Sequence, residues 1–406
     1  MSKELKPQIR FKGFEDDWVK EKLGDFTSSY SGGTPTSSRK EYYGGNIPFI
    51  RSGEIHGNST ELFITQKGYQ ESSAALVKKG DILYALYGAT SGEVNISQID
   101  GAINQAILAI IPDVNHNALF LKYWLIKNKN NITATYLQGG QGNLSASIVK
   151  NIMVDQTSLD EQNKIGKYIS AIDFLINNTS REIGRLETMK QASLQKMFPR
   201  PGITTPEIRF SGFTDPWKVG KLSDILEIDD TRNSDNKYNR EDVLSVSGYY
   251  GLVNQIEFQG RSFAGASLLG YKITKPGQVI YTKSPLKAQP FGIVKSNQYG
   301  IGIISPLYAV YNPKEDNVAD FVHYYFAPVA KLNNYLRPLI NKGAKNTILI
   351  SDETAIDGEI VYPSGKEQKF IADYFIKLDK LLVSKRQKLA KLRQIKQACL
   401  NKMFIN

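Results

Sequence analysis

The chain has 406 residues, and its 51 Lys and Arg against 40 Asp and Glu give a net charge of +11. The length suits two or three domains of roughly 150 residues each. A single cysteine excludes a disulfide framework and a cysteine-based zinc module, and three scattered histidines argue against a histidine metal site. The basic balance and the absence of a long apolar run predict a cytoplasmic protein with no membrane contact and an acidic partner, most commonly nucleic acid.

The sequence contains a tandem duplication. Pro7–Trp18 recurs as Pro206–Trp217 with eight of 12 positions identical, and Asp160–Phe198 recurs as Lys366–Phe404 with 14 of 39 identical. Weaker matches fill the interval in the same order, as a duplicated unit with small loop insertions would produce. The chain is therefore predicted to consist of two related copies.

The first part of each copy, residues 1–155 and 206–363, is rich in Gly, Tyr, Ile and Val and in turn signals. Short apolar runs at Asp81–Tyr87 and Gln278–Thr282 predict strands. Helices are expected at Asn117–Lys127 and Val318–Tyr335. These elements predict an α+β fold with two strand-rich domains.

The second part of each copy predicts one long helix, within residues 156–198 and 364–406, and residues 199–205 link the copies. The apolar stripe of each helix is wider than a two-stranded seam requires. We expect the helices to pair as an antiparallel coiled coil, because tandem units that pack symmetrically exchange positions by a two-fold rotation. The predicted seam contains four apolar residues, Ile172, Leu186, Leu378 and Leu392.

Catalytic signatures are mostly absent from the sequence. It contains no Walker lysine loop and no Gly-x-Gly-x-x-Gly after a strand. Glu367-Gln-Lys369 matches part of a metal-nuclease pattern, but the first copy has Glu161-Gln-Asn163 there, and an acid at a helix start explains both. Cys399 falls on a core position of its helix and is expected to be a structural thiol. No catalytic, cofactor or metal centre is predicted on this chain.

The positive charge is concentrated in the second long helix. Residues 160–198 carry six Lys and Arg and five Asp and Glu, a net +1, whereas residues 366–404 carry eleven and three, a net +8. The rest of the chain is therefore only +2 (11 − 9). The cluster is either a solvated helix face or a face near phosphate or another acidic partner, and the sequence leaves both interpretations open.

Amide, hydroxyl, aromatic and basic side chains gather in the loops of both strand-rich domains. Asn and Gln can pair with adenine and Arg or Lys with guanine, while glycine-rich backbone can approach phosphates. The alternative for any one of these residues is a solvated turn. The candidate DNA-binding residues are Arg51, Tyr87, Ser91, Gln138, Gln141 and Asn143 in the first domain, and Lys283, Ser284, Lys287, Lys342, Lys345 and Asn346 in the second.

Taken together, these features resemble the specificity (S) subunit of type I restriction-modification systems. The resemblance covers essentially the whole chain and rests on Ser31–Pro35, Tyr42–Phe49, Lys79–Leu83 and Gly142–Ser145, with the Ile-Arg-Phe-x-Gly-Phe-x-Asp-x-Trp element that heads each half. The second domain lacks the Ser-Gly-Gly-Thr-Pro element, so its DNA target should differ from that of the first.

The resemblance implies that each strand-rich domain is a target-recognition domain for one half of a bipartite, asymmetric double-stranded DNA sequence. It implies a non-catalytic chain that recruits two methyltransferase (M) subunits, which use S-adenosylmethionine to methylate adenine N6, and two restriction (R) subunits, which use ATP and Mg²⁺ to translocate and cleave DNA. Helices of the M subunits would then cover the apolar residues outside the seam, including Ile169, Ile176, Phe375 and Leu382. Two alternatives remain: a self-sufficient DNA methyltransferase or nuclease, and a coiled-coil scaffold without a nucleic-acid role.

Overall fold

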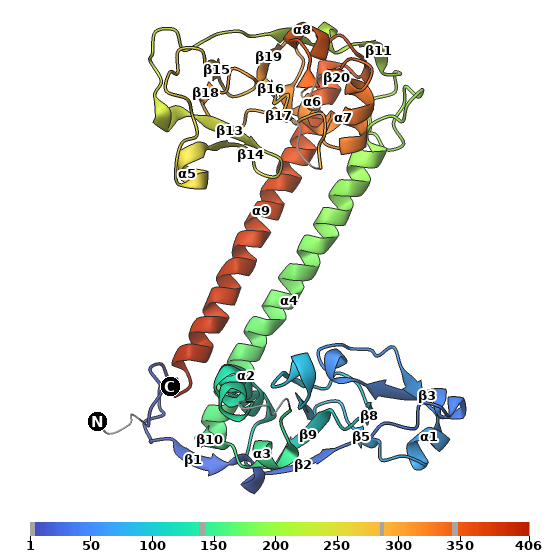
Figure 1. Ribbon diagram of the computed structural model, residues 1–406, viewed down its shortest axis with the longest axis vertical. Helices are drawn as coiled ribbons and strands as arrows, with labels where there is room; N and C mark the ends of the chain where they lie inside the picture. Colours follow the sequence, from blue (N-terminus) through green and yellow to red (C-terminus); the bar gives the residue numbers. More distant parts are fainter. Residues whose placement is uncertain (1–4, 138–142, 285–287, 343–347, 406) are drawn as a thin grey trace. The chain divides into compact units, whose positions relative to one another are not determined.

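The computed structural model describes residues 5–137, 143–284, 288–342 and 348–405, without the side chains of 341 and 342. The chain forms two compact units (Figure 1). Unit 1 contains Met1–Arg181 and Gln387–Asn406, and unit 2 contains Glu182–Arg386. Each unit combines one strand-rich domain with parts of two long helices, which confirms the α+β fold expected from the sequence. None of the described helices combines the length and apolar character that a bilayer-crossing segment needs.

Unit 1 contains ten strands and the shorter helices α1–α3 among its described residues. Its strands are β1 (Val19–Lys22), β2 (Thr27–Ser31), β3 (Tyr43–Ile50), β4 (Phe63–Ile64), β5 (Ala75–Val77), β6 (Ile82–Ala85), β7 (Val94–Ile96), β8 (Gly101–Ile103), β9 (Ile107–Pro112) and β10 (Met153–Gln156). Its helices are α1 (Gln66–Gln70), α2 (Ala118–Tyr136), α3 (Ala146–Lys150) and the first part of α4 (Leu159–Lys196).

Unit 2 is built in the same way from later residues. Its strands are β11 (Lys218–Lys221), β12 (Leu226–Ile228), β13 (Leu244–Ser247), β14 (Gly251–Asn254), β15 (Lys272–Thr274), β16 (Val279–Tyr281), β17 (Val294–Ser296), β18 (Gly302–Ile304), β19 (Ala309–Pro313), β20 (Asn341–Lys342), β21 (Ile348–Leu349) and β22 (Glu359–Tyr362). Its helices are α5 (Gln255–Gln259), α6 (Ala319–Tyr325), α7 (Val329–Leu336), α8 (Asp352–Ala355) and the first part of α9 (Gly365–Lys402).

The central sheet has the same strand order in both units. Unit 1 has β2-β9-β6-β7 and unit 2 has β12-β19-β16-β17, with antiparallel neighbours throughout. A two-stranded ribbon, β1-β10 or β11-β22, accompanies each sheet. Strands β6 and β16 are buried on both faces, which explains why their sequences read as continuous apolar runs. The duplicated sequence therefore folds into duplicated sheets.

After the last strand of the central sheet, unit 1 has one helix, α2, where unit 2 has two, α6 and α7. The predicted helix at 117–127 extends to Tyr136, and the side chain of Asn117 caps its start by accepting from the amide of Phe120 at 2.9 Å. The expected single helix at 318–335 is instead broken into α6 and α7. Pro328 precedes α7, and proline lacks the N–H that a continuous helix would need.

The long helices α4 and α9 pair antiparallel in each unit (Figure 1). In unit 1 Asp173 of α4 forms an ion pair with Lys396 of α9 at 2.6 Å. In unit 2 Glu182 pairs with Lys385 at 2.6 Å, and the Ser193 hydroxyl lies 2.9 Å from that of Tyr374. Later residues of α4 thus contact earlier residues of α9, which is the antiparallel pairing expected from the duplication.

The helix faces are buried differently from the heptad expectation. Ile169 lies in the core of unit 1, while Phe375 is in the core of unit 2 and Leu382 is also buried within the chain. The prediction that subunits outside this chain cover them is therefore wrong, because the chain's own domains and helices cover them. Ile176 is half-buried. Exposed apolar side chains occur instead at other positions of the two helices: Tyr168, Phe174, Leu175, Met189, Phe370, Leu381 and Val383.

Candidate nucleic-acid interface

Two of the polar loops predicted for the first domain are held side by side. The loop after β6 meets residue 143 through a backbone bridge between Tyr87 and Asn143. The amide of Leu144 also donates to the carbonyl of Leu86 at 2.9 Å. Gly88 adopts a φ of +70°, a conformation that suits glycine, and lets the chain turn there. Tyr87 and Asn143 are both exposed, so this pair of loops presents an aromatic and an amide side chain together.

Ser91 does not share that exposure. Its side chain is buried, and its hydroxyl donates to the carbonyl of Leu86 at 3.1 Å. The hydroxyl therefore stabilises the turn of the loop and does not face a partner. The sequence shows only that a serine lies in a polar loop. It does not tell whether the hydroxyl stabilises the loop or contacts DNA.

Arg51 lies at the surface, with Nε and one terminal nitrogen of its guanidinium engaged. It donates to Glu54 at 2.9 and 3.0 Å and to Glu61 at 2.8 Å. Hydrogen bonding from Arg51 is the main reason that the pKa of Glu54 falls to about 2. Two carboxylates therefore neutralise this arginine, and a phosphate would have to compete with them for it.

In the second domain Lys283 lies in the loop after β16, which corresponds to the loop after β6 in the first domain. Its φ is +49°, in the left-handed region that residues other than glycine rarely adopt. Its ammonium pairs with Asp352 at the start of α8. The buried Lys272 pairs with the same carboxylate at 2.6 Å. Burial opposes ionisation of Asp352, but the hydrogen bonds from the two lysines outweigh it and lower the pKa.

Several predicted contacts cannot be placed. Gln138, Gln141, Lys287, Lys345 and Asn346 lie outside the described residues. Lys342 is described only as backbone, in the β20–β21 pair, and the hydroxyl of Ser284 donates to the carbonyl of Thr282 at 3.2 Å. The structure therefore brings together one predicted loop pair in unit 1 and one lysine–aspartate cluster in unit 2.

The predicted seam residues are buried to different degrees. Ile172 and Leu378 are buried, whereas Leu186 and Leu392 are half-buried. Cys399 is also half-buried against the unit 1 core, and burial raises the pKa of its thiol.

Sequence reasoning missed a buried ion pair that repeats in both units. Arg10 donates to both carboxylate oxygens of Glu161 at 2.8 and 2.6 Å, and Trp18 donates to one of them at 3.2 Å. In unit 2 Arg209 donates to Glu367 at 2.7 and 2.8 Å, and Trp217 at 3.3 Å. The repeated Ile-Arg-Phe-x-Gly-Phe-x-Asp-x-Trp element thus binds the first turn of each long helix. The sequence signal that could have revealed this ion pair is that the arginine, the tryptophan and the glutamate are identical in both copies.

This ion pair bears directly on the nuclease alternative. Glu367 is buried, and both of its carboxylate oxygens are bound by Arg209, whereas Lys369 of the Glu-x-Lys pattern is exposed. A carboxylate in a bidentate arginine pair holds the fold together and leaves no open face for a metal ion. Within the described part of the chain, no group of three or more His, Cys, Asp and Glu side chains is arranged to hold a metal.

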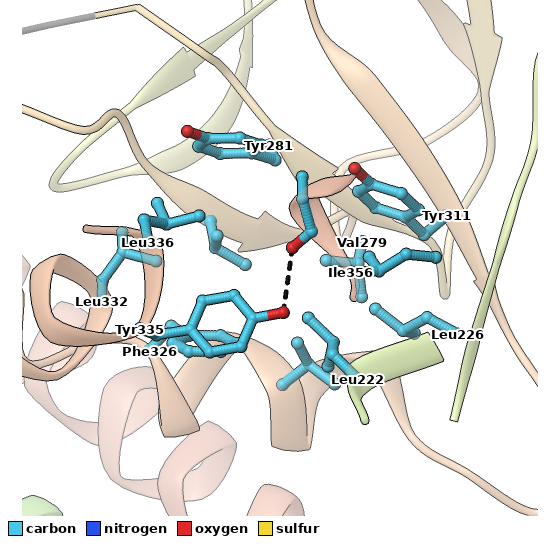
Figure 2. Close-up of a pocket in the computed structure, with 13 residues that line it drawn as sticks. Leu222, Leu226, Val279, Tyr281, Tyr311, Phe326, Leu332, Tyr335, Leu336 and Ile356 are labelled. Atoms are coloured by element: carbon cyan, nitrogen blue, oxygen red, sulfur yellow. Dashed lines mark hydrogen bonds between the residues drawn. The ribbon is translucent and has the colours of Figure 1, made fainter. Parts of the chain in front are cut away.

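A cavity of about 20 Å³ lies in the core of unit 2, between the central sheet and helices α6–α8 (Figure 2). Leucine, valine and aromatic side chains line it. The hydroxyl of Tyr335 donates to the carbonyl of Ala355 at 2.9 Å, the dashed bond in Figure 2, and that of Tyr311 donates to the carbonyl of Asp352 at 3.0 Å. This space has room for about one water molecule and lacks paired acids and bases, so it is a packing gap rather than an active site.

Comparison with known proteins agrees with this architecture. Residues 15–188 match the family described as the type I restriction modification DNA specificity domain. The MjaIX specificity subunit of Methanocaldococcus jannaschii is 29% identical over 235 residues, which cover 54% of each chain. The putative MjaX specificity subunit of the same organism is 23% identical over 95% of this chain and 92% of its own length. The chain spans about half the length of the MjaIX and MjaVIII subunits that it matches, at 54% and 50%.

A solved structure shares the fold. The S subunit of the type I restriction-modification system from M. genitalium matches with a TM-score of 0.64 and 13% identity, over 99% of both chains. Residues 15–188 therefore carry a type I restriction modification DNA specificity domain. Over its whole length, the chain is similar to the specificity subunits of type I restriction-modification systems in sequence and in fold.

Proposed function

We propose that this chain selects the DNA target of a type I restriction-modification complex, with each strand-rich domain reading one half of a bipartite sequence. The supporting observation is that the loop after the same strand of the central sheet carries different chemistry in the two units. After β6, unit 1 has an exposed tyrosine beside Asn143. After β16, unit 2 has Lys283, held by Asp352.

This difference fits two unlike half-sites. An amide suits adenine, and a lysine suits the O6 and N7 acceptors of guanine. A residue in a strained backbone conformation persists only where its surroundings impose it, and the ion pair with Asp352 supplies that constraint for Lys283. Lys283 is therefore held in position before DNA binds. On binding, its ammonium would exchange the carboxylate of Asp352 for a base.

Catalysis belongs, in this proposal, to other subunits. Two M subunits would methylate one adenine in each half-site with S-adenosylmethionine, and two R subunits would supply ATP- and Mg²⁺-dependent cleavage. Each M subunit would have to flip its adenine out of the duplex, because a methyltransferase cannot reach its target atom inside the stack. The role of this chain is to choose which adenine is presented.

Methylome sequencing of cells that contain this chain and M subunits tests the proposal. Asn143→Ala should weaken or relax only one half-site, and Lys283→Ala only the other, by roughly 1–3 kcal/mol per lost base contact. Gln141→Ala should affect the same half-site as Asn143→Ala. Replacing Lys342, Lys345 and Asn346 by alanine should affect the same half-site as Lys283→Ala. Val114→Ala, at an exposed position between β9 and α2, is the matched control. Loss of both half-sites to the same extent from a change in one domain would overturn the assignment of one half-site to each domain.

A further inference from the structure

In unit 1, side chains from two other helices meet at the carboxylate of Asp173 on α4. The hydroxyl of Tyr123 on α2 donates to Asp173 on α4 at 2.8 Å. Lys396 on α9 pairs with the other oxygen of the same carboxylate at 2.6 Å. The lysine ammonium also lies 5.8 Å from the centre of the Tyr123 ring. We call these three residues the unit 1 triad.

Unit 2 repeats this arrangement with the roles of the long helices exchanged. Tyr324 on α6 donates to Asp379 on α9 at 2.9 Å, and Lys190 on α4 pairs with the other carboxylate oxygen. Lys190 lies 5.8 Å from the centre of the Tyr324 ring. These residues form the unit 2 triad. In both triads the aspartate belongs to the helix that follows its own domain, and the lysine belongs to the other long helix.

The triads are set into the protein rather than onto its surface. Tyr123 and Tyr324 are almost completely buried. The side chains of Asp173 and Lys396 are 22% and 25% exposed, and those of Lys190 and Asp379 are 23% and 36% exposed. This partial burial reduces the solvent screening that weakens surface ion pairs, more so in unit 1 than in unit 2. Burial, followed by the charge of the neighbouring aspartate, raises the pKa of each tyrosine, so the phenol keeps the proton that it donates.

The spacing of the charges is the same on both helices. Asp173 and Lys190 are 17 residues apart on α4 (190 − 173), and Asp379 and Lys396 are 17 apart on α9 (396 − 379). With the helices antiparallel, each aspartate therefore meets the lysine of the other helix in a single register. A slip of one turn moves the partners about 5.4 Å apart in both triads at once.

The same spacing also disfavours other arrangements. If the two copies of the helix were aligned parallel, by their sequence repeat, aspartate would face aspartate and lysine would face lysine. Charged residues that attract in one register and repel in another are a known means of specifying helix pairing. Hydrophobic seams alone specify register less sharply, and here two of the four predicted seam residues are only half-buried.

We infer that the two triads are positioning residues: Asp173–Lys396 and Asp379–Lys190 set the register of α4 against α9, and Tyr123 and Tyr324 fix the short helix of each domain to that register. This inference rests on the proposed function for its consequence in DNA binding. One helical turn of slip, about 5.4 Å, exceeds the 3.4 Å rise of a base pair, so the triads would fix the number of bases between the half-sites.

The register can be measured without DNA. Spin labels at Thr188→Cys on α4 and Ser384→Cys on α9, both exposed positions of unit 2, are introduced into the full chain with Cys399→Ser. We expect one narrow distance distribution in this background. Asp379→Lys, which places two lysines together, should broaden or shift the distribution by about one turn, or roughly 5 Å. The exchange Asp379→Lys with Lys190→Asp should restore the narrow distribution.

Two further variants keep the test decisive. Asp379→Asn retains an acceptor for Tyr324 and removes only the charge, so it should broaden the distribution even if Asp379→Lys fails to fold. Glu182→Ala removes the more exposed Glu182–Lys385 pair of the same helices and should leave the distribution narrow. An unchanged distribution in both Asp379 variants, or broadening in Glu182→Ala equal to theirs, would overturn the inference.

The DNA measurement separates this inference from the proposed function. Methylation is compared on sites whose half-sites are unchanged and whose spacer is native or one base pair longer. Asp379→Asn should lower the preference for the native spacer by about tenfold, and the charge exchange should restore it. A purely structural role would reduce methylation equally at both spacers and would leave this ratio unchanged. If the unaltered chain with M subunits methylates no bipartite site, the proposed function fails, while the label distances still decide the register.

Discussion

The backbone amide of Ile9 donates a hydrogen bond to the carbonyl of Lys402, 2.9 Å away. The equivalent bond in unit 2 joins Ile208 to Lys196 at 3.0 Å. In unit 2 the bonded segments are close in sequence, whereas in unit 1 they come from nearly opposite ends of it. The last turn of α9 thus completes a domain whose strands begin almost 400 residues earlier.

The residues after α9 should accordingly be essential to unit 1. Phe404 is buried against Trp18 and Phe120, and Phe198 holds the matching place beside Trp217 and Phe321 in unit 2. Phe404→Ala should cost about 3–5 kcal/mol of unfolding free energy. Hydrogen exchange should show the lost protection in unit 1, and Phe198→Ala should show it in unit 2. Equal loss in both units from Phe404→Ala would mean that the cores are not separate.

Glu367 should be needed for stability and not for chemistry. Glu367→Gln leaves Arg209 as a buried charge without its ionic partner, which typically costs about 3–5 kcal/mol. The exposed Lys369→Ala serves as the matched control and should change stability by no more than about 0.5 kcal/mol. Denaturant unfolding of both variants measures this difference. If Glu367→Gln unfolded like the unaltered chain and Lys369→Ala did not, the Glu-x-Lys pattern would need another explanation.

Acid should destabilise unit 2 through His323. Burial, and then the charges of Lys295 and Lys190, lower the pKa of His323 well below 6.5. Its Nε2 lies 3.1 Å from the Lys295 ammonium, which can donate to it, and its Nδ1 lies 3.1 Å from the Ser296 hydroxyl. The folded protein therefore holds this imidazole neutral.

The sign of the pH effect follows from that difference. Above pH 6.5 neither state protonates His323, and its contribution to stability is complete. As the pH falls below 6.5 only the unfolded chain takes the proton, so stability falls by up to about 1.4 kcal/mol per pH unit. Unfolding at pH 7 and pH 5.5 should show a smaller loss for His323→Gln, whereas His56→Gln, at an exposed site, should behave like the unaltered chain.

In the proposed complex, the exposed apolar residues of α4 are the better candidates for contact with M subunits. Phe174 and Leu175 are 64% and 42% exposed, and side chains of this kind left uncovered often mark a protein interface. Phe174→Ser should weaken co-purification with M by about 30-fold or more, the effect of an interface residue worth at least about 2 kcal/mol. Val114→Ser changes another exposed apolar residue, between β9 and α2, and should have no effect. Equal weakening by both would indicate a general loss of solubility.

The duplication, the two strand-rich domains and the long helices could be predicted because repeats, turn signals and apolar periodicity are visible in the sequence itself. None of them requires knowledge of which residues are in contact. The buried faces of the helices could not be predicted. If Ile172 is the first core position of a heptad, Tyr168 and Leu175 fall on the second core position, facing the partner helix. Both are exposed, and Ile169 is buried instead. An α-helix drifts against a strict seven-residue repeat, and here a whole domain packs against its first turns and sets which face is covered.

The candidate site was predictable only as a set of loops. Composition pointed to polar residues after β6 and β16, and Asn143 does lie beside Tyr87. The burial of Ser91 and the pairing of Lys283 with Asp352 depend on contacts between segments far apart in sequence. The same is true of the Arg10–Glu161 pair, whose members are 151 residues apart.

The closure of unit 1 by residues 403–405 also sets an order of events during synthesis. Unit 2 is one continuous stretch, 182–386, and can fold once it has left the ribosome. The domain translated first must wait for a further 224 residues (405 − 181) before its core is complete. At roughly 5–20 residues per second, that delay is on the order of 10 to 45 seconds. We therefore expect the N-terminal domain to depend more on chaperone protection during synthesis than unit 2 does.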